Sequence, residues 1–164
     1  MDIDVVTLAV DAENCDAGLK ELHKWSNETT RFIMALVDGL FWRQEDPLTF
    51  EQFLIGLIGG GDDARELIQQ KKKRCRRLIQ RCLENGAHGV MIGDDLAYNK
   101  GPFLSPDDLA NWIFPGLREM VEIIKKGGGV AFLHSCGNLM GIVDQILAAG
   151  FDGVHGLALS AGND

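Results

Sequence analysis

A histidine and a cysteine stand two residues apart at the end of an apolar run, and these residue types are suited to metal or nucleophile chemistry. His134 and Cys136 close the segment that begins at Val130, and Gly137 and Asn138 follow them. In an extended strand, residues i and i+2 point to the same face, so the imidazole and the thiol can converge on one point. An imidazole nitrogen and a thiolate sulfur suit Zn²⁺, and Gly137 allows a tight turn afterwards.

From the residues alone, three interpretations of this pair remain open. They are a zinc site, a nucleophilic Cys–His pair, and a buried structural cysteine beside a hydrogen-bonded histidine. Two ligands do not make a stable zinc site, and no His-x-x-His or Cys-x-x-Cys spacing elsewhere in the chain supplies more. Residue types and spacing therefore favour the structural interpretation.

Further polar side chains follow other short apolar runs. Asp38, Asp94 and Asp95 each come directly after such a run. The rest of this set is Asp11, Glu13, Asn14, Asn138, His155 and residues 160–164. In parallel α/β folds, ligands bind at the carboxyl ends of the strands. A single Asp after a strand is explained by a role in its loop, but five strand ends in succession predict a shared site.

Strand and helix signals alternate along the chain and define the elements that must position these residues. Short apolar runs predict buried strands at 5–10, 32–37, 89–93, 130–134 and 153–157. Helical stretches are predicted at 15–25, 49–57, 62–85, 105–126 and 139–149. Ser105 and Pro106 mark one helix start, and Gly150 follows one helix end. The β-α-β-α order predicts a parallel sheet in a single domain over residues 1–164.

Composition and charge exclude several classes of function. The chain has 16 Lys and Arg against 24 Asp and Glu, a net charge of −8, which argues against a nucleic-acid binder. Seven basic residues between 71 and 81 share a predicted helix with an apolar stripe, and we interpret them as its solvated face. Without an export signal or an apolar run of about 18 residues, we expect a cytoplasmic protein with reduced cysteines and no membrane contact.

Several segments resemble the uroporphyrinogen decarboxylase superfamily. They are the run from Gly86 to Asp95, the segments Leu104-Ser-Pro and Phe114-Pro, and the run from Val130 through the His-x-Cys-Gly-Asn pattern. The resemblance covers most of the chain from about Arg31 onward, and it implies an α/β barrel of eight units. Because 164 residues fall short of the roughly 200–250 of such a barrel, we expect about half of a TIM-type barrel. The chain would then be the middle portion of a longer protein.

One branch of this superfamily contains the methylcobamide:coenzyme M methyltransferases and related corrinoid-dependent enzymes. That branch carries zinc on a His-x-Cys pair and a distant third Cys, and His134 with Cys136 matches the pair. The resemblance implies zinc-dependent methyl transfer between a methyl-corrinoid, such as methylcobalamin, and a thiol, with a corrinoid protein as partner. No Cys follows Cys136, so the third ligand is missing. Asp94 or Asp95 could complete the shell if their loop folds over the strand end, and we expect that site to be labile.

Two alternatives remain beside the methyltransferase. Uroporphyrinogen decarboxylases use no metal and hold the carboxylates of a tetrapyrrole with arginines and a Phe-Ser-Asp type motif, which is absent here. A metal-free decarboxylase acting on a tetrapyrrole is therefore one alternative. The other is a non-catalytic fragment that acts as a binding module.

The predicted site lies at the mouth formed by the strand carboxyl ends. We assign Asp94 and Asp95 as catalytic residues, Asp38, Asn138 and His155 as substrate-binding residues, and His134 and Cys136 as metal ligands. We expect the isolated 164-residue chain to be inactive. We also expect two copies to complete each other's barrel as a homodimer, because open strand edges present unpaired backbone groups.

Overall fold

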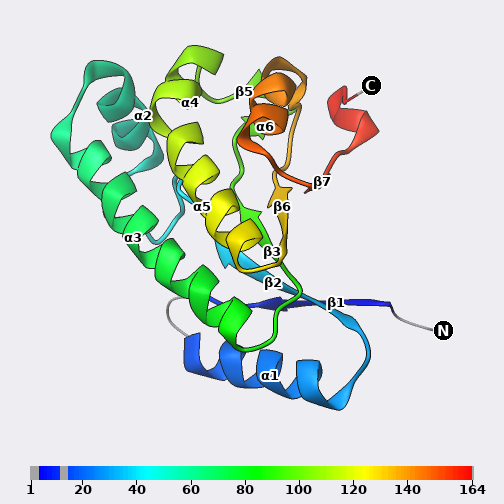
Figure 1. Ribbon diagram of the computed structural model, residues 1–164. Coiled ribbons are helices and arrows are strands. Elements are labelled where there is room, and N and C mark those ends of the chain that lie inside the picture. The colour runs from blue at the N-terminus through cyan, green and yellow to red at the C-terminus, as the bar shows by residue number, and fades with distance from the viewer. Residues whose placement is uncertain (1–3, 12–14, 164) are drawn as a thin grey trace.

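The computed structural model describes residues 4–11 and 15–163, and its centre is one five-stranded parallel sheet (Figure 1). The strands lie in the order β1 (Val5–Ala9), β2 (Phe32–Asp38), β3 (Gly89–Gly93), β6 (Val130–His134) and β7 (Gly153–His155). All four pairings are parallel, so the five carboxyl ends lie along one edge. Glu13, Asn14 and Asp164, which were predicted to lie near the site, fall outside the described residues.

The helices connect successive strands. They are α1 (Cys15–Glu28), α2 (Phe50–Gly59), α3 (Asp62–Glu84), α4 (Pro106–Trp112), α5 (Phe114–Lys126) and α6 (Val143–Ala149). Two 3-10 helices, η1 (Met140–Ile142) and η2 (Leu159–Ala161), and a hairpin of β4 (Ala97–Tyr98) and β5 (Gly101–Pro102) complete the described chain. None of the helices within the described residues is long and apolar enough to cross a membrane.

The strand order identifies the sheet as part of a barrel wall. Along the sheet, the strands follow one another in the order in which the chain forms them. Right-handed crossovers between such neighbours place every connecting helix on the same face, and α3 and α5 lie side by side there (Figure 1). A doubly wound sheet needs a reversal of strand order, which the sheet of the described residues does not have. The predicted fold class, a parallel α/β segment of a barrel, is confirmed.

Successive side chains of a strand point to opposite faces of the sheet, and this separates the core from the site. Ile33, Ala35 and Val37 of β2 are fully buried in the cluster between sheet and helices. Leu36 and Asp38 point to the opposite face, where they line a pocket. Apolar positions of these strands therefore build the core, and the alternate positions build the site.

Three details differ from the sequence-based expectation. The helix expected over 105–126 is divided into α4 and α5 at Ile113, because Pro115 lacks an N–H and restricts the residue before it. The helix expected over 139–149 begins as η1, and the β4–β5 hairpin was not predicted. Elsewhere the boundaries agree to within a few residues, and Ser105 caps α4 by accepting from the Asp108 N–H as expected.

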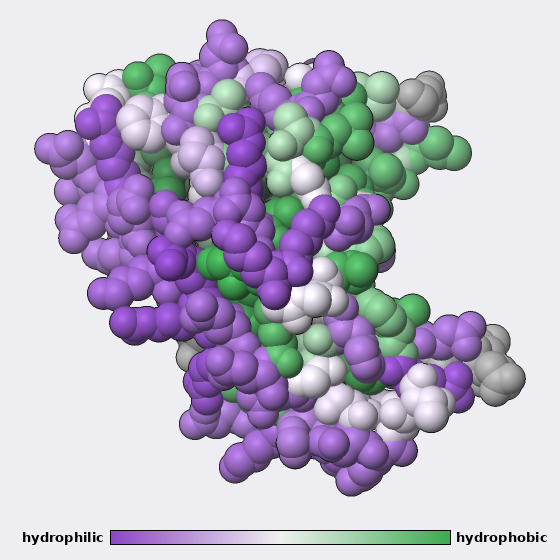
Figure 2. All heavy atoms as spheres, in the orientation of Figure 1, coloured by the Kyte–Doolittle hydropathy of each residue, from purple (hydrophilic) through white to green (hydrophobic). Residues whose placement is uncertain are grey.

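The basic side chains of α3 also differ in their exposure to solvent, whereas all of them were predicted to be solvated. Hydrophilic side chains cover the outer side of α3 in Figure 2. Lys71, however, is 1% exposed, and its ammonium group donates to the Phe41 carbonyl and to Asp46, each at 2.6 Å. The interpretation of a wholly solvated face is wrong for Lys71. Lys72 and Arg76 reach across to Glu119 of α5, each at 2.6 Å.

Candidate metal centre and adjoining pocket

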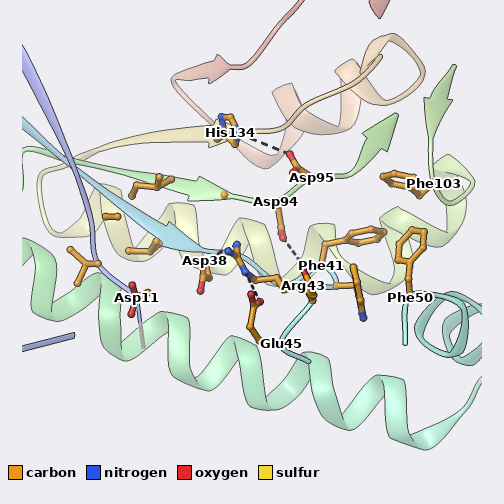
Figure 3. Close-up of a pocket in the computed structure, with 17 residues that line it drawn as sticks. Asp11, Asp38, Phe41, Arg43, Glu45, Phe50, Asp94, Asp95, Phe103 and His134 are labelled. Carbon is orange, nitrogen blue, oxygen red and sulfur yellow. Dashed lines mark hydrogen bonds and ion pairs between the residues drawn. The ribbon is translucent and has the colours of Figure 1, made fainter. Parts of the chain in front are cut away.

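Three side chains of different ligand chemistry meet at the ends of β3 and β6. His134 Nε2 lies 3.9 Å from Cys136 Sγ and 4.0 Å from Asp95 Oδ1. One ligand atom from each residue lies within 4.8 Å of the other two. Figure 3 shows the His134 ring and the Asp95 carboxylate turned toward each other. The structure thus joins the predicted His134–Cys136 pair to Asp95, which was predicted as catalytic.

The turn after β6 holds Cys136 in this position. Cys136 donates its backbone N–H to Asp95 Oδ1 at 2.9 Å, and the Ser135 hydroxyl accepts from the Leu96 N–H at 3.0 Å. Gly137 follows with a φ of 87°, and a Cβ there would collide with the backbone of Ala97. Glycine is therefore required for the turn to pack against the segment that carries Asp95.

The second ring nitrogen of His134 also has a close contact, with the ring of His155. His134 Nδ1 lies 2.8 Å from His155 Nδ1, and the two residues are register partners in β6 and β7. Nδ1 therefore faces β7, and Nε2 faces Asp95 and Cys136. His155, predicted as a substrate-binding residue, contacts His134 directly.

The electrostatics of the cluster favour a cation. Cys136 is exposed, so the interpretation as a buried structural cysteine is wrong. Partial burial and the neighbouring Asp95 carboxylate raise the pKa of the Cys136 thiol above its ordinary value. A second anion beside Asp95 is disfavoured unless a positive charge lies between them. Oxygen, nitrogen and sulfur donors together form a set that suits Zn²⁺, so these residues fit the metal that the resemblance implied.

Asp94 points away from the cluster and toward the loop that follows β2. It is 2% exposed, and its two carboxylate oxygens accept the backbone N–H groups of Leu40 at 2.9 Å and Phe41 at 2.7 Å. Burial raises its pKa to about 6, against the lowering effect of those two hydrogen bonds. Asp94 thereby fastens the loop after β2 to the end of β3, and its predicted catalytic role stays a prediction.

A pocket of about 690 Å³ opens beside the cluster, at the carboxyl ends of β1, β2, β3 and β6. Its charged lining residues are Asp11, Asp38, Arg43, Glu45, Asp94, Asp95 and His134, and its aromatic ones are Phe41, Trp42, Phe50 and Phe103 (Figure 3). The Arg43 guanidinium pairs with Asp38 at 2.8 Å and lies 3.8 Å from Glu45. Carboxylates therefore outnumber the arginine, and the arginine is already paired.

The structure brings most residues of the predicted common mouth together. Asp38, Asp94, Asp95 and His134 line the pocket, and Cys136 contacts His134. Asn138 is turned elsewhere: its side chain accepts from the Met140 N–H and reaches Gly162. Its predicted role in substrate binding stays a prediction.

The aromatic side chains that line the pocket, and Arg43, were not predicted from the sequence. Phe41, Trp42 and Arg43 lie three to five residues after Asp38, in the loop that follows β2. That position, just beyond a strand carboxyl end, was the available signal.

Comparisons with known proteins agree with this architecture. The model of the family "Uroporphyrinogen decarboxylase (URO-D)" matches residues 48–156. A methyltransferase from Methanosarcina mazei is similar in structure, with a TM-score of 0.73 and 20% identity over 89% of this chain and 44% of that chain. A D-tagatose 3-epimerase-like protein has a TM-score of 0.55 and 15% identity over 93% of this chain and 53% of that chain. No curated protein matches the chain.

A further similar structure is that of the IOLI protein with a bound zinc atom. Its TM-score is 0.52, with 13% identity over 92% of this chain and 51% of that chain. At these identities the structural likeness concerns the fold. The chain spans about half the length, or less, of these three proteins.

Proposed function

Because the chain belongs to the uroporphyrinogen decarboxylase family, we propose that it carries the zinc-dependent methyl-transfer chemistry of the methyltransferase branch of that superfamily. The observation that carries this proposal is the convergence of Asp95, His134 and Cys136 within 4.8 Å. The fold shared with the Methanosarcina mazei methyltransferase supports it.

In this proposal Asp95, His134 and Cys136 hold the metal. Zinc with an open position lowers the pKa of a bound thiol and makes it a nucleophile at neutral pH. His134 offers the lone pair of Nε2, and Asp95 contributes a carboxylate charge. Cys136 gives up its thiol proton when it becomes a ligand, so metal affinity rises with pH.

The pocket beside the cluster is the proposed entrance for the thiol acceptor and the methyl donor. Its aromatic side, including Phe41 and Phe103, offers an apolar wall, and its carboxylates disfavour anionic groups. A uroporphyrinogen ring carries many carboxylates and needs free arginines, whereas Arg43 is paired with Asp38. The charge of the pocket therefore favours methyl transfer over the decarboxylase alternative.

The proposed methyl donor is a methyl-corrinoid, presented by a corrinoid protein at the mouth of the barrel. The carboxyl ends of the strands, where Asp38 and His134 lie, form that mouth. A second copy of this chain remains our proposal for the partner that covers the open strand edges of β1 and β7.

Zinc titration against a chromophoric chelator tests the metal assignment. We expect one zinc per chain, with binding lost in His134→Ala and Cys136→Ser and weakened in Asp95→Asn. His23→Ala is the matched control, because His23 is exposed on α1, on the far side of the sheet from the cluster. Equal zinc binding by wild type and the His134 and Cys136 variants would contradict the proposal.

An activity assay distinguishes a methyltransferase from a decarboxylase. Because the chain spans about half the length of its structural relatives, the assay uses the zinc-loaded protein with its barrel completed. It is mixed with methylcobalamin and a thiol, and loss of the methyl–cobalt bond is followed by absorbance. Zinc-dependent demethylation supports the proposal, whereas metal-independent loss of carboxyl groups from uroporphyrinogen contradicts it.

A further inference from the structure

We propose that His155 is a positioning residue, which fixes the tautomer and ring orientation of His134 and does not contact substrate. The inference rests on the proposed metal centre and extends it by one residue. His134 Nδ1 and His155 Nδ1 are 2.8 Å apart, and the ring centroids are 5.0 Å apart with an angle of 34° between the planes. This distance is that of a hydrogen bond, in which one nitrogen donates and the other accepts.

The direction of that hydrogen bond follows from the other side of the His134 ring. Nε2 faces Cys136 Sγ at 3.9 Å and Asp95 Oδ1 at 4.0 Å. A ring nitrogen binds a metal only through its free lone pair, so the single proton of neutral His134 must lie on Nδ1. His134 Nδ1–H then donates to His155 Nδ1, and His155 carries its own proton on Nε2.

The backbone of β6 and β7 holds the two rings together. His134 and His155 are direct register partners, so both side chains project from the same face of the sheet. The Ser135 N–H donates to the His155 carbonyl at 3.2 Å. Gly156 follows with a φ of 93°, and a Cβ there would lie 2.8 Å from the Ser135 carbonyl oxygen. This close approach fixes where β7 presents the His155 ring.

His155 acts through His134 and not as a fourth ligand. The donor atoms of Asp95 and Cys136 lie on the Nε2 side of the His134 ring, whereas His155 contacts Nδ1. A ligating histidine whose other nitrogen donates to a fixed acceptor is held in the binding tautomer, and loss of the acceptor typically costs 10–100-fold in metal affinity.

The test uses Co²⁺ as the probe, because its visible absorption reports both affinity and thiolate ligation. His155→Phe keeps a planar ring but has no acceptor, whereas His155→Asn places an amide oxygen near the position of Nδ1. We expect His155→Phe to lower the Co²⁺ affinity by about 10–100-fold and His155→Asn to retain most of it. The thiolate-to-cobalt band should persist in both variants at saturating Co²⁺, because Cys136 is unchanged. His155 is exposed at the end of β7, and thermal unfolding of the metal-free variants checks that both fold.

Three results would overturn the inference. His155→Phe could bind Co²⁺ as tightly as wild type, which would show that the hydrogen bond does not matter. Both variants could lose affinity equally, or the cobalt spectrum could change at saturation, which would indicate that the imidazole itself is a ligand. If wild type binds no Co²⁺, the proposed metal centre fails together with this inference. In the first two cases, binding abolished by His134→Ala leaves the metal centre intact.

Discussion

Replacing Lys71 with methionine tests how the wall of the pocket is held in place. Lys71 Nζ donates to the Phe41 carbonyl and pairs with Asp46 Oδ2, each at 2.6 Å. The Lys71 and Asp46 side chains are only 1% and 8% exposed. Both partners lie in the loop between β2 and α2, which brings Phe41 and Arg43 to the pocket. Lys71→Met therefore leaves a buried carboxylate and a buried carbonyl without their cation.

The size of the expected loss in stability follows from the burial of this ion pair. Removing one partner of a buried ion pair typically costs about 3–5 kcal/mol, because the other charge stays buried and uncompensated. For chains of about 150–250 residues, each kcal/mol lowers the melting temperature by about 2–4 °C. We therefore expect Lys71→Met to lower the Tm by about 6–20 °C. Adding Asp46→Asn should restore part of that loss, because it removes the uncompensated charge.

Urea unfolding and thermal melting, both followed by circular dichroism, measure the effect. Lys73→Met is the matched control, since Lys73 is exposed on the same helix and makes no ion pair within the described chain. Its free energy of unfolding should stay within about 0.5 kcal/mol of wild type. If Lys71→Met is as stable as Lys73→Met, or if Asp46→Asn makes it still less stable, the reasoning is refuted.

Three more predictions concern stability and assembly. Gly39→Ala places a Cβ against the Asp94 carboxylate, so we expect the free energy of unfolding in urea to fall by about 1–3 kcal/mol. Unchanged stability would contradict this close packing of Asp94 against the loop after β2. Burial raises the pKa values of Cys75 and Cys82 to about 12, so above pH 9 the native state keeps thiol protons that the unfolded state releases. As the pH rises above 9, the free energy of unfolding should then fall by about 1.4 kcal/mol per pH unit for each thiol. If the free energy of unfolding of the Cys75→Ala/Cys82→Ala variant falls with pH as steeply as that of wild type, this prediction is refuted. Light scattering should give a mass near twice 18.0 kDa for the proposed homodimer, against a monomer value if the proposal is wrong.

The strands and their order could be predicted because their signals are local. Gly89–Gly93 and Val130–His134 are short apolar runs bounded by polar or glycine residues, and both strands have the predicted bounds. Polar residues directly after such runs predicted one shared edge, and the structure places Asp38, Asp95 and His134 there. Parallel pairing alone is enough to produce that convergence.

The details that were missed depend on contacts between distant segments. Residue types and spacing alone favoured a buried Cys136, but the turn at Gly137 carries its side chain to the surface beside Asp95. The contact of His155 with His134 requires the register of β6 and β7, which composition does not specify. Lys71 had a signal that was overlooked, since it lies four residues before Cys75 on the apolar stripe of α3.

X-ray absorption at the zinc edge of the zinc-loaded chain tests the proposed metal centre most directly. We predict a shell with one sulfur at about 2.3 Å, from Cys136, and nitrogen or oxygen ligands from His134 and Asp95 at about 2.0–2.2 Å. In Cys136→Ser the sulfur should disappear from the shell. A wild-type shell without sulfur, or one with several sulfurs, would contradict the assignment of Asp95, His134 and Cys136 as the ligands.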